Sequence, residues 1–363
     1  MSATKCAEIV KEIGAEIRNG EHGAPGTAFM TVRELCDVFD ISLVTAQRIV
    51  NRLKEDGLLV RSGRRTSIAA RSMHGAAASC RIGVVVTKID NPFFSRLLNA
   101  LELAGRRRGL ELISAGSDYN VRHEEHLFRM LENSGAGGFL VCPAHDIDSA
   151  PALRNLTLPF ALIGRRVAGV DADTVMTNDF EAGRLAAIHL IEQRCSDYLY
   201  MGISNFRNDM RFRGFAFELH QRGVELSGER HLRVDVDRDE SDLPEYLARL
   251  HRGGKTGVFC YHDLFALRMI RAARLCKFSI PREVSVVGFD DLPIASEVYP
   301  SLTSISYPLA GIAENALEML LRRSERSFAG AGAVNYLDPS LVIRESSHEI
   351  PDGPAVSQGR RII

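Results

Sequence analysis

The sequence has no run of apolar residues near the ~20 that a helix needs to cross a bilayer. Residues 1–11 also lack the apolar core that a secretory signal peptide requires, so export is not expected. Hydrophobic residues make up 45% of the chain and charged residues 25%, which is ordinary for a folded globular protein. These features predict a protein of the cytoplasm with no membrane partner.

Metal and redox sites also lack their usual residue patterns. No two of the seven cysteines form a C-x-x-C pair, the spacing typical of zinc and thiol-redox sites. His189, His220 and His231 do not have metal-ligand spacing either. We therefore expect no metal site, and we expect the cysteines to be reduced and mostly buried thiols.

Signals of catalysis are similarly weak. The run Gly135-Ala-Gly-Gly138 lacks the full dinucleotide-binding fingerprint and is better explained as a turn from a helix into a strand. After residue 80 the chain has only three lysines, Lys88, Lys255 and Lys277, and none stands in a context that suggests a Schiff base. We predict no catalytic residue, no cofactor and no enzyme activity.

Charge is unevenly distributed, although the formal net charge is only −1. Residues 42–72 contain seven Lys or Arg side chains and two acidic ones, so this segment carries +5 while the rest of the chain carries −6. A local basic patch of this kind is typical of a segment that contacts DNA, and a solvated charged surface is the alternative explanation.

The first seventy residues begin with a predicted helix. Its buried stripe consists of apolar residues at helical spacing, namely Cys6, Val10, Ile13 and Ile17. Three glycines and a proline within residues 20–26 then require a loop.

A second helix is predicted to begin at a capping box. The Thr31 hydroxyl and the Glu34 carboxylate can each accept from the other residue's free backbone amide at the start of a helix. We expect Leu35, Val38 and Phe39 to form the buried face of this helix.

A third helix follows after a tight turn. Ser42 is a natural N-cap, Ile49, Val50 and Leu53 face inward, and Gly57 ends the helix. Residues 58–61 and 66–69 then have the pattern of two short strands around a tip at residues 62–64.

Three helices followed by a β-hairpin form a winged helix-turn-helix, which we assign to residues 1–69. In that motif the third helix enters the major groove of DNA by its N-terminus, and the hairpin lies along the backbone or the minor groove. The expected partner of this head is a double-stranded DNA operator.

Three segments of the head stand out, namely Arg33-Glu-Leu35, Ser42-Leu-Val-Thr45 and Glu55-Asp-Gly-Leu-Leu-Val-Arg61. They resemble the R-E-L, the Ser-initiated helix and the E-x-G-L-x-x-R of the GntR family of regulators. The family usually has Arg at the positions of Leu43 and Gln47, and a second wing glycine at the position of Arg65. Arg is the commonest bidentate partner of guanine, so these departures predict a different operator preference.

The residue types in the head also predict how each contacts DNA. Gln47 can pair with adenine, while Leu43 can contact only apolar edges such as a thymine methyl. Together with Thr45 they are our candidates for base contacts, and Ser42 begins the helix that carries them. The side chains expected mainly to neutralise phosphates are Arg33, Arg48, Arg52, Arg64 and Arg65.

Beyond the head, small residues at 70–79 with no periodic apolar face predict a linker. Apolar strands then alternate with helical segments; the strands are expected at 82–86, 110–114, 138–142, 159–163, 198–203, 257–260 and 284–289. This alternation predicts an α/β fold with a doubly wound parallel sheet. About 265 residues exceed one core, so we expect two lobes.

We place the first lobe at residues 80–177 and 307–333, and the second lobe at residues 178–306 and 334–347. The remaining residues, 348–363, are expected to form a loose tail.

Polar residues follow the strand ends, where open α/β sheets bind their ligands. The segments concerned are Asn91-Pro-Phe-Phe94, Asn178-Asp-Phe-Glu-Ala-Gly183, Arg211-Phe-Arg-Gly-Phe215, His262-Asp263, Val284-Ser-Val-Val-Gly-Phe-Asp-Asp291 and Leu302-Thr-Ser-Ile-Ser-Tyr-Pro308. In this order they resemble the motifs of the LacI/GalR family, whose sensor domain is similar to a periplasmic sugar-binding protein. A GntR-type head on this body resembles the architecture of arabinose repressors.

The resemblance implies a small-molecule effector bound in a cleft between the two lobes. Phe93 and Phe94 would form one wall, Arg211 would donate hydrogen bonds and Asp290 would accept them. The full set of predicted effector contacts is Phe93, Phe94, Arg165, Arg211, His262, Asp263, Asp290 and Tyr307. The alternatives are that one Phe is purely a core residue and that Arg211 and Asp290 simply pair with each other.

Two departures from the family leave the effector open. His262 stands where the family often has Asn, and Gly164 where it often has Asp. A sugar is our first choice, and a nucleobase or nucleoside is the alternative.

Taken together, the resemblances imply a ligand-responsive transcription regulator, most simply a repressor, that acts as a homodimer on a roughly palindromic operator. Heads of the GntR type can also be fused to pyridoxal-phosphate-dependent bodies, but such bodies are longer and need a Schiff-base lysine. A transport binding protein is the third possibility, and the missing signal peptide together with the DNA-binding head argues against it.

Overall fold

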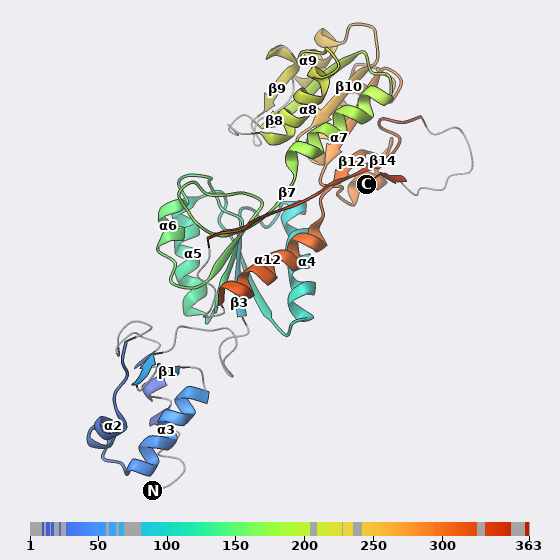
Figure 1. Ribbon diagram of the computed structural model, residues 1–363. Coiled ribbons are helices and arrows are strands. Elements are labelled where there is room, and N and C mark those ends of the chain that lie inside the picture. Colours follow the sequence, from blue (N-terminus) through green and yellow to red (C-terminus); the bar gives the residue numbers. More distant parts are fainter. Residues whose placement is uncertain are drawn as a thin grey trace. The chain divides into compact units, whose positions relative to one another are not determined.

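The computed structural model describes most of the chain (Figure 1). The described residues are 9–62 with gaps before residue 27 and at 56–57, then 65–68, 81–203, 209–226, 228–234, 242–324, 331–349 and 360–362. Arg64 and the linker predicted at residues 70–79 lie outside them.

The chain divides into two units. Unit 1 comprises residues 1–175 and 312–335, and unit 2 comprises residues 176–311 and 336–363. Unit 1 contains the N-terminal head and a first α/β lobe, and unit 2 is a second α/β lobe. The division falls within β7 (Asp173–Thr177), α12 (Leu309–Ser324) and β13 (Val334–Leu337), so three segments connect the two units.

The head has the predicted order of elements. Helical residues between 9 and 17 precede α2 (Val32–Phe39), α3 (Leu43–Glu55) and the antiparallel pair β1 (Leu59–Ser62) and β2 (Arg65–Ile68). The predicted capping box is confirmed: the Glu34 amide donates to Thr31 Oγ1 at 3.2 Å, and the Thr31 amide donates to Glu34 Oε2 at 2.7 Å. Local side-chain chemistry therefore defines where α2 begins.

The head core corrects one predicted residue. Leu35, Ile49, Val50 and Leu53 are buried as expected, but Val38 is 64% exposed. The buried face of α2 runs from Leu35 toward Val32, Cys36 and Phe39, which pack against the head core. Because each residue advances about 100° around a helix, Val38 falls outside that face.

The α/β lobe of unit 1 is built on a six-stranded sheet. Its strands are ordered β13-β7-β6-β5-β3-β4, with β3 at Arg81–Val86, β4 at Glu111–Gly116, β5 at Phe139–Val141 and β6 at Phe160–Ile163. Strands β3 to β7 pair in parallel.

Helices cover both faces of this sheet because successive strands are added on one side of β3 up to β4 and on its other side from β5 onward. The helices are α4 (Pro92–Arg106), α5 (Val121–Asn133), α6 (Ala150–Arg154) and α12. The connection from β3 to β4 moves outward and the one from β4 to β5 moves back, and right-handed crossovers place such connections on opposite faces. Figure 1 shows α5 and α6 on one face and α4 and α12 on the other.

Unit 2 is a seven-stranded sheet in the order β15-β14-β12-β11-β10-β8-β9. Its strands are β8 (Asp197–Ile203), β9 (His231–Val234), β10 (Thr256–Cys260), β11 (Val284–Phe289), β12 (Thr303–Ser306), β14 (Ser340–Ile343) and β15 (Arg360–Ile362). Its helices are α7 (Asp179–Glu192), α8 (Met210–His220), η1 (Gly228–Arg230), α9 (Leu243–Leu250), α10 (Asp263–Leu275) and α11 (Ile294–Glu297). The predicted fold class is confirmed: an N-terminal helix-turn-helix head is followed in the chain by two doubly wound lobes, each with a mainly parallel sheet.

The end of the chain departs from the expectation of a loose tail. Residues 360–362 form β15, which pairs antiparallel with β14. Strand β14 would otherwise be the edge of the sheet, and an edge strand presents unpaired backbone donors and acceptors to any extended segment within reach.

Candidate functional site

The exposed face of α3 carries the side chains predicted to contact bases. Leu43 is 61% exposed and the neighbouring Val44 is 64% exposed, although both are apolar. Gln47 is exposed one turn further along, and its Nε2 lies 3.1 Å from Asn51 Oδ1. This contact holds the Gln47 amide along the helix. Asn51 and the exposed Val44 thus belong to the same face of α3, and the sequence had singled out neither.

The start of α3 is organised by Ser42. Its hydroxyl lies 2.9 Å from Thr45 Oγ1 and accepts from the Thr45 amide at 3.4 Å. The Thr45 hydroxyl therefore takes part in the helix cap, a role that competes with its predicted contact to a base.

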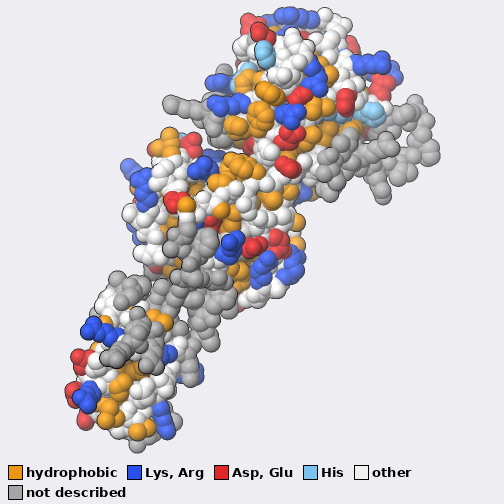
Figure 2. All heavy atoms as spheres, in the orientation of Figure 1, with side chains coloured by type: hydrophobic (Ala, Val, Ile, Leu, Met, Phe, Trp, Pro, Cys, Tyr) orange, Lys and Arg blue, Asp and Glu red, His pale blue; other side chains and the backbone are white. Residues whose placement is uncertain are grey.

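The described basic side chains predicted to contact phosphates lie on α2, α3 and β2. Arg33, Arg48, Arg52 and Arg65 are all exposed, as phosphate contacts must be. Figure 2 shows basic and hydrophobic side chains close together on the surface of the head.

In unit 2 the predicted effector residue Arg211 contacts two aromatic rings, a backbone carbonyl and a carboxylate. Its Cζ lies 3.4 Å from the ring centroid of Phe289 and 4.4 Å from that of Tyr261. Nη1 donates to the Tyr261 carbonyl at 2.5 Å, and Nε lies 3.3 Å from Asp179 Oδ2. The ion-pair partner of Arg211 is thus Asp179, which the sequence analysis had missed, while Asp290 contributes to the electrostatics of Arg211.

Arg211 lies in the first turn of α8, and the N-cap residue Asp209 fixes where this helix begins. This buried side chain accepts from the Phe212 amide at 3.1 Å and from the Tyr200 hydroxyl at 2.7 Å. Partial burial raises the pKa of Asp179 and the Arg211 charge opposes that rise, so the two side chains are electrostatically coupled.

Two glycines bring α7 and α8 into backbone contact. A Cβ at Gly214 would lie 1.9 Å from the Phe180 carbonyl oxygen, and a Cβ at Gly183 would lie 2.1 Å from the Arg211 carbonyl oxygen. Only residues without a side chain permit this approach. Because Asp179 begins α7, the close approach of the helices sets its distance from Arg211.

Two further predicted residues, Asp290 and Tyr307, lie near Phe289. Asp290 follows β11 directly, is 9% exposed and has φ 104°. Tyr307 is buried and contacts the Phe289 ring edge-to-face, with centroids 5.9 Å apart.

His262 is the N-cap of α10. Its Nδ1 accepts from the Phe265 amide at 3.1 Å, which leaves the proton on Nε2. Burial, with the nearby Arg211 and Arg268 charges, lowers the pKa of His262 to about 4, so the ring is neutral at pH 7.

Asp263 requires a correction, because the structure places it in the interior of unit 2. Its exposure is 0%, and its two oxygens accept from Ser304 Oγ at 2.6 Å and the Leu292 amide at 2.7 Å. Burial raises the pKa of Asp263 to about 7, and these two hydrogen bonds oppose the rise. A carboxylate with both oxygens satisfied internally does not face an effector.

In unit 1 the predicted aromatic pair lies at the start of α4. Asn91 caps this helix by accepting from the Phe93 amide at 2.9 Å, and Pro92 occupies its first turn. The rings of Phe93 and Phe94 meet edge-to-face, with centroids 5.1 Å apart, and both are half-buried.

Unit 1 also contains buried polar groups that the sequence did not single out. Glu124 on α5 is completely buried, accepts from the Ala144 amide at 2.6 Å and interacts electrostatically with Arg165, which follows β6. Thr87 and Ser117, which follow β3 and β4, are buried, and neither hydroxyl has a hydrogen-bond partner within the described residues. Thr87 directly follows the strand predicted at 82–86, where polar residues were expected, whereas nothing in the helical pattern distinguished Glu124.

In the described part of the chain, no three His, Cys, Asp or Glu side chains gather in a way that could hold a metal ion. No helix within the same residues combines the length and apolar character needed to cross a bilayer.

Two protein families match segments of the chain. Residues 187–347 match a periplasmic binding protein-like domain, and residues 21–66 match the MarR family. The head therefore matches a different family from the GntR family to which its motifs were compared.

Two similar proteins are named as transcriptional repressors. The arabinose metabolism transcriptional repressor of Geobacillus stearothermophilus is 25% identical over 95% of this chain and 98% of its own length. The repressor PurR of Mannheimia succiniciproducens is 25% identical over 88% of this chain and 99% of its own length.

Solved structures resemble the chain in fold. A periplasmic binding protein/LacI transcriptional regulator from Alkaliphilus metalliredigens, complexed with D-xylulofuranose, has a TM-score of 0.63 and 23% identity over 75% of this chain and 100% of its own. A complex of the transcriptional regulator CelR with cellobiose has a TM-score of 0.65 and 21% identity over 85% of this chain and 92% of its own. The chain therefore joins an N-terminal helix-turn-helix head, matched by the MarR family, to a domain of periplasmic-binding-protein-like fold.

Proposed function

We propose that this chain is a ligand-responsive transcriptional repressor whose head binds a DNA operator and whose α/β domain binds a small-molecule effector. The observation that carries the proposal is Arg211, a buried guanidinium held between two aromatic rings at the ligand-binding edge of a parallel sheet. A cation oriented by Asp179 and the Tyr261 carbonyl can donate to an effector without further reorganisation. The repressor names of the relatives support this assignment.

A sugar is the effector that we favour. Asp290 can accept from hydroxyl groups, Arg211 can donate to them, and an aromatic ring can cover an apolar sugar face. The bound xylulofuranose and cellobiose of the two similar structures, and the arabinose repressor among the relatives, support this choice. A nucleobase or nucleoside remains the second candidate, because aromatic rings also stack on planar bases.

We retain the other sequence-predicted contacts as proposals. These residues are Phe93, Phe94, Arg165, His262 and Tyr307. His262 would act as a neutral donor through Nε2, because its Nδ1 is occupied by the helix cap.

For the head, we propose that α3 enters the major groove with Leu43 and Gln47 toward base edges. Its R-E-L and E-x-G-L-x-x-R motifs support a wing of the GntR type. Two copies of the chain would present two heads to a palindromic operator, so we propose a homodimer that acts in the cytoplasm, where its DNA lies.

The test is to replace Arg211 and compare it with a neighbour on the same helix. Arg211→Ala removes the buried donor, whereas Arg213→Ala removes an exposed arginine two residues away and serves as the control. The probe is whichever of ribose, arabinose or xylulose most raises the melting temperature of the unmodified chain, since a ligand that binds only the folded state stabilises it.

We expect Arg211→Ala to weaken binding of that sugar roughly 100-fold in calorimetric titration, because truncating a buried charged donor costs about 2–5 kcal/mol. Operator binding without sugar should be unchanged in both variants. Equal sugar affinity in the Arg211→Ala and Arg213→Ala variants would show that the effector binds elsewhere.

A further inference from the structure

The turn that carries Asp290 has an unusual backbone. Asp290 and Asp291 are consecutive, neither is glycine, and their φ angles are 104° and 48°. Side chains disfavour such angles, so the surrounding structure must hold the turn in place. Holding it also holds the Asp290 carboxylate, the proposed acceptor for the effector.

Three successive backbone amides of this turn each have a fixed acceptor. The Asp290 amide donates to the Ile305 carbonyl at 2.9 Å. The Asp291 amide donates to Ser304 Oγ at 3.0 Å, and the Leu292 amide donates to Asp263 Oδ2 at 2.7 Å. Two of the three acceptors are side chains, from β12 and α10 respectively.

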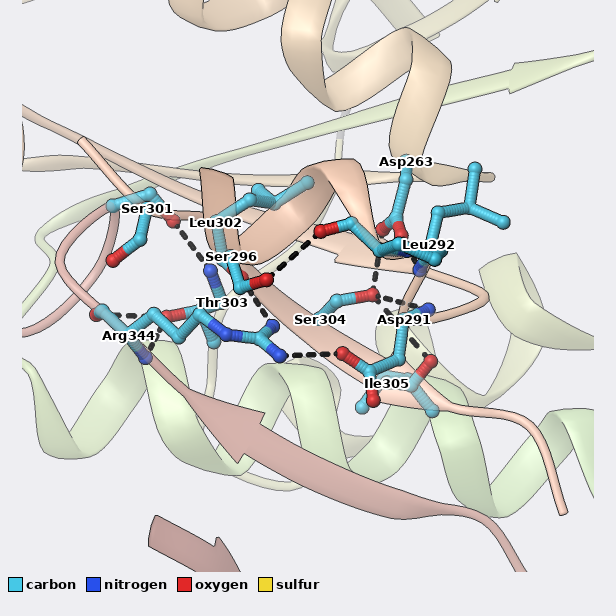
Figure 3. A network of polar contacts seen from close by, with 12 residues as sticks. Asp263, Asp291, Leu292, Ser296, Ser301, Leu302, Thr303, Ser304, Ile305 and Arg344 are labelled. Carbon is cyan, nitrogen blue, oxygen red and sulfur yellow. Dashed lines mark hydrogen bonds and ion pairs between the residues drawn. The ribbon is translucent and has the colours of Figure 1, made fainter. Parts of the chain in front are cut away.

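The two side-chain acceptors are joined to each other, as Figure 3 shows. Ser304 Oγ donates to Asp263 Oδ1 at 2.6 Å, and both residues are completely buried. On the other side of the turn, Arg344 Nη2 donates to Asp291 Oδ1 and Nη1 donates to the Leu302 carbonyl, both at 2.7 Å. The turn is therefore held between α10, β12 and the end of β14.

Gly288, in the strand that precedes the turn, leaves space for the Asp263 carboxylate. A Cβ at Gly288 would lie 2.2 Å from Asp263 Oδ1. Without a side chain at this position the Asp263 carboxylate can lie directly against β11 and reach the Leu292 amide.

We propose that Asp263 and Ser304 are positioning residues for effector binding, because together they fix the backbone that orients the Asp290 carboxylate. The inference rests on the proposed role of Asp290 as an effector acceptor. It replaces the direct contact that the sequence had suggested for Asp263 by an action through its neighbour.

The experiment compares Ser304→Ala with Ser296→Ala. Ser296 is an exposed serine close to the turn whose hydroxyl donates to the Pro293 carbonyl at 2.8 Å, outside the Asp263–Ser304 pair. Asp263→Asn is the second variant, which keeps the shape of the side chain in case Ser304→Ala does not fold. The first readout is hydrogen exchange of the Asp291 and Leu292 amides without effector, and the second is affinity for the sugar probe chosen from ribose, arabinose and xylulose.

We expect Ser304→Ala and Asp263→Asn to accelerate exchange of these two amides about tenfold and to weaken sugar binding about tenfold. Ser296→Ala should leave both readouts unchanged. A purely structural role would lower the melting temperature but leave the sugar dissociation constant as it was, and that result would overturn the proposal.

The exchange readout separates this inference from the proposed function. If none of the three sugars binds the unmodified chain, the choice of a sugar effector is wrong. Accelerated exchange in the variants would still support the conclusion that Asp263 and Ser304 hold the turn. Unchanged exchange in both variants refutes the inference whatever the sugars do.

Discussion

The contact between α7 and α8 allows a quantitative prediction for Gly214→Ala. The new Cβ would lie 1.9 Å from the Phe180 carbonyl oxygen and 2.8 Å from the Phe180 carbonyl carbon. Both obstacles are backbone atoms of another helix, so no side chain can rotate away. The two helices would have to separate by roughly 1 Å to restore an ordinary contact.

The expected loss of stability follows from two opposing effects. Inserting a methyl group into close packing costs about 1–3 kcal/mol, and a clash with rigid backbone belongs at the upper end of that range. Alanine is favoured over glycine inside a helix by about 1 kcal/mol, which offsets part of the cost. We therefore expect Gly214→Ala to lower the free energy of unfolding by about 2 kcal/mol.

Urea unfolding measures this change, and Gly228→Ala is the control. A Cβ at Gly228 meets nothing within 4 Å, so that variant should stay within about 0.5 kcal/mol of the unmodified chain. Separation of the helices should also move Arg211 away from Asp179, so sugar affinity should fall with stability in Gly214→Ala. A Gly214→Ala chain as stable as the unmodified one would refute the reasoning.

Two further predictions concern DNA binding and pH. Gln47→Ala should change the operator sequence preferred in a library selection, and an unchanged preference would contradict the assignment of Gln47 to base contacts. Arg65→Ala should instead weaken binding to all sequences and reduce the slope of log affinity against log salt by about one. Asp263 has a folded-state pKa of about 7, above its unfolded value, so the stability from its protonated form is complete below about pH 4 and is lost as pH rises toward 7. The Asp291 charge contributes to this raised pKa, and the Arg344 charge opposes it. Between pH 5 and pH 8 the free energy of unfolding, measured with urea, should fall by about 2–3 kcal/mol more in the unmodified chain than in Asp263→Asn. Equal falls in the two chains would show that Asp263 does not titrate with a raised pKa.

Local rules in the sequence determined the elements of the structure. The capping box at Thr31 and Glu34 depends only on residues three positions apart, and it begins α2 as predicted. Alternating strands and helices after residue 80 specified two parallel sheets, because each buried strand reads as a continuous apolar run. Such signals depend on near neighbours in the chain, and a sequence records those directly.

What surrounds each side chain was decided only by the tertiary structure. Val38 has the spacing of a buried residue, but the direction in which α2 packs leaves it exposed. Asp263 and Asp290 both follow the carboxyl ends of parallel strands, yet one is enclosed by Ser304 and Leu292 and the other begins a strained turn.

The partners of the candidate site show the same division. The sequence marked Arg211, but its pairing with Asp179 depends on two helices that touch at Gly183 and Gly214. That contact is a property of two backbones brought together by the fold of unit 2. Residue type and spacing thus determined which groups could do chemistry, and long-range packing decided which of them are exposed, paired or held in place.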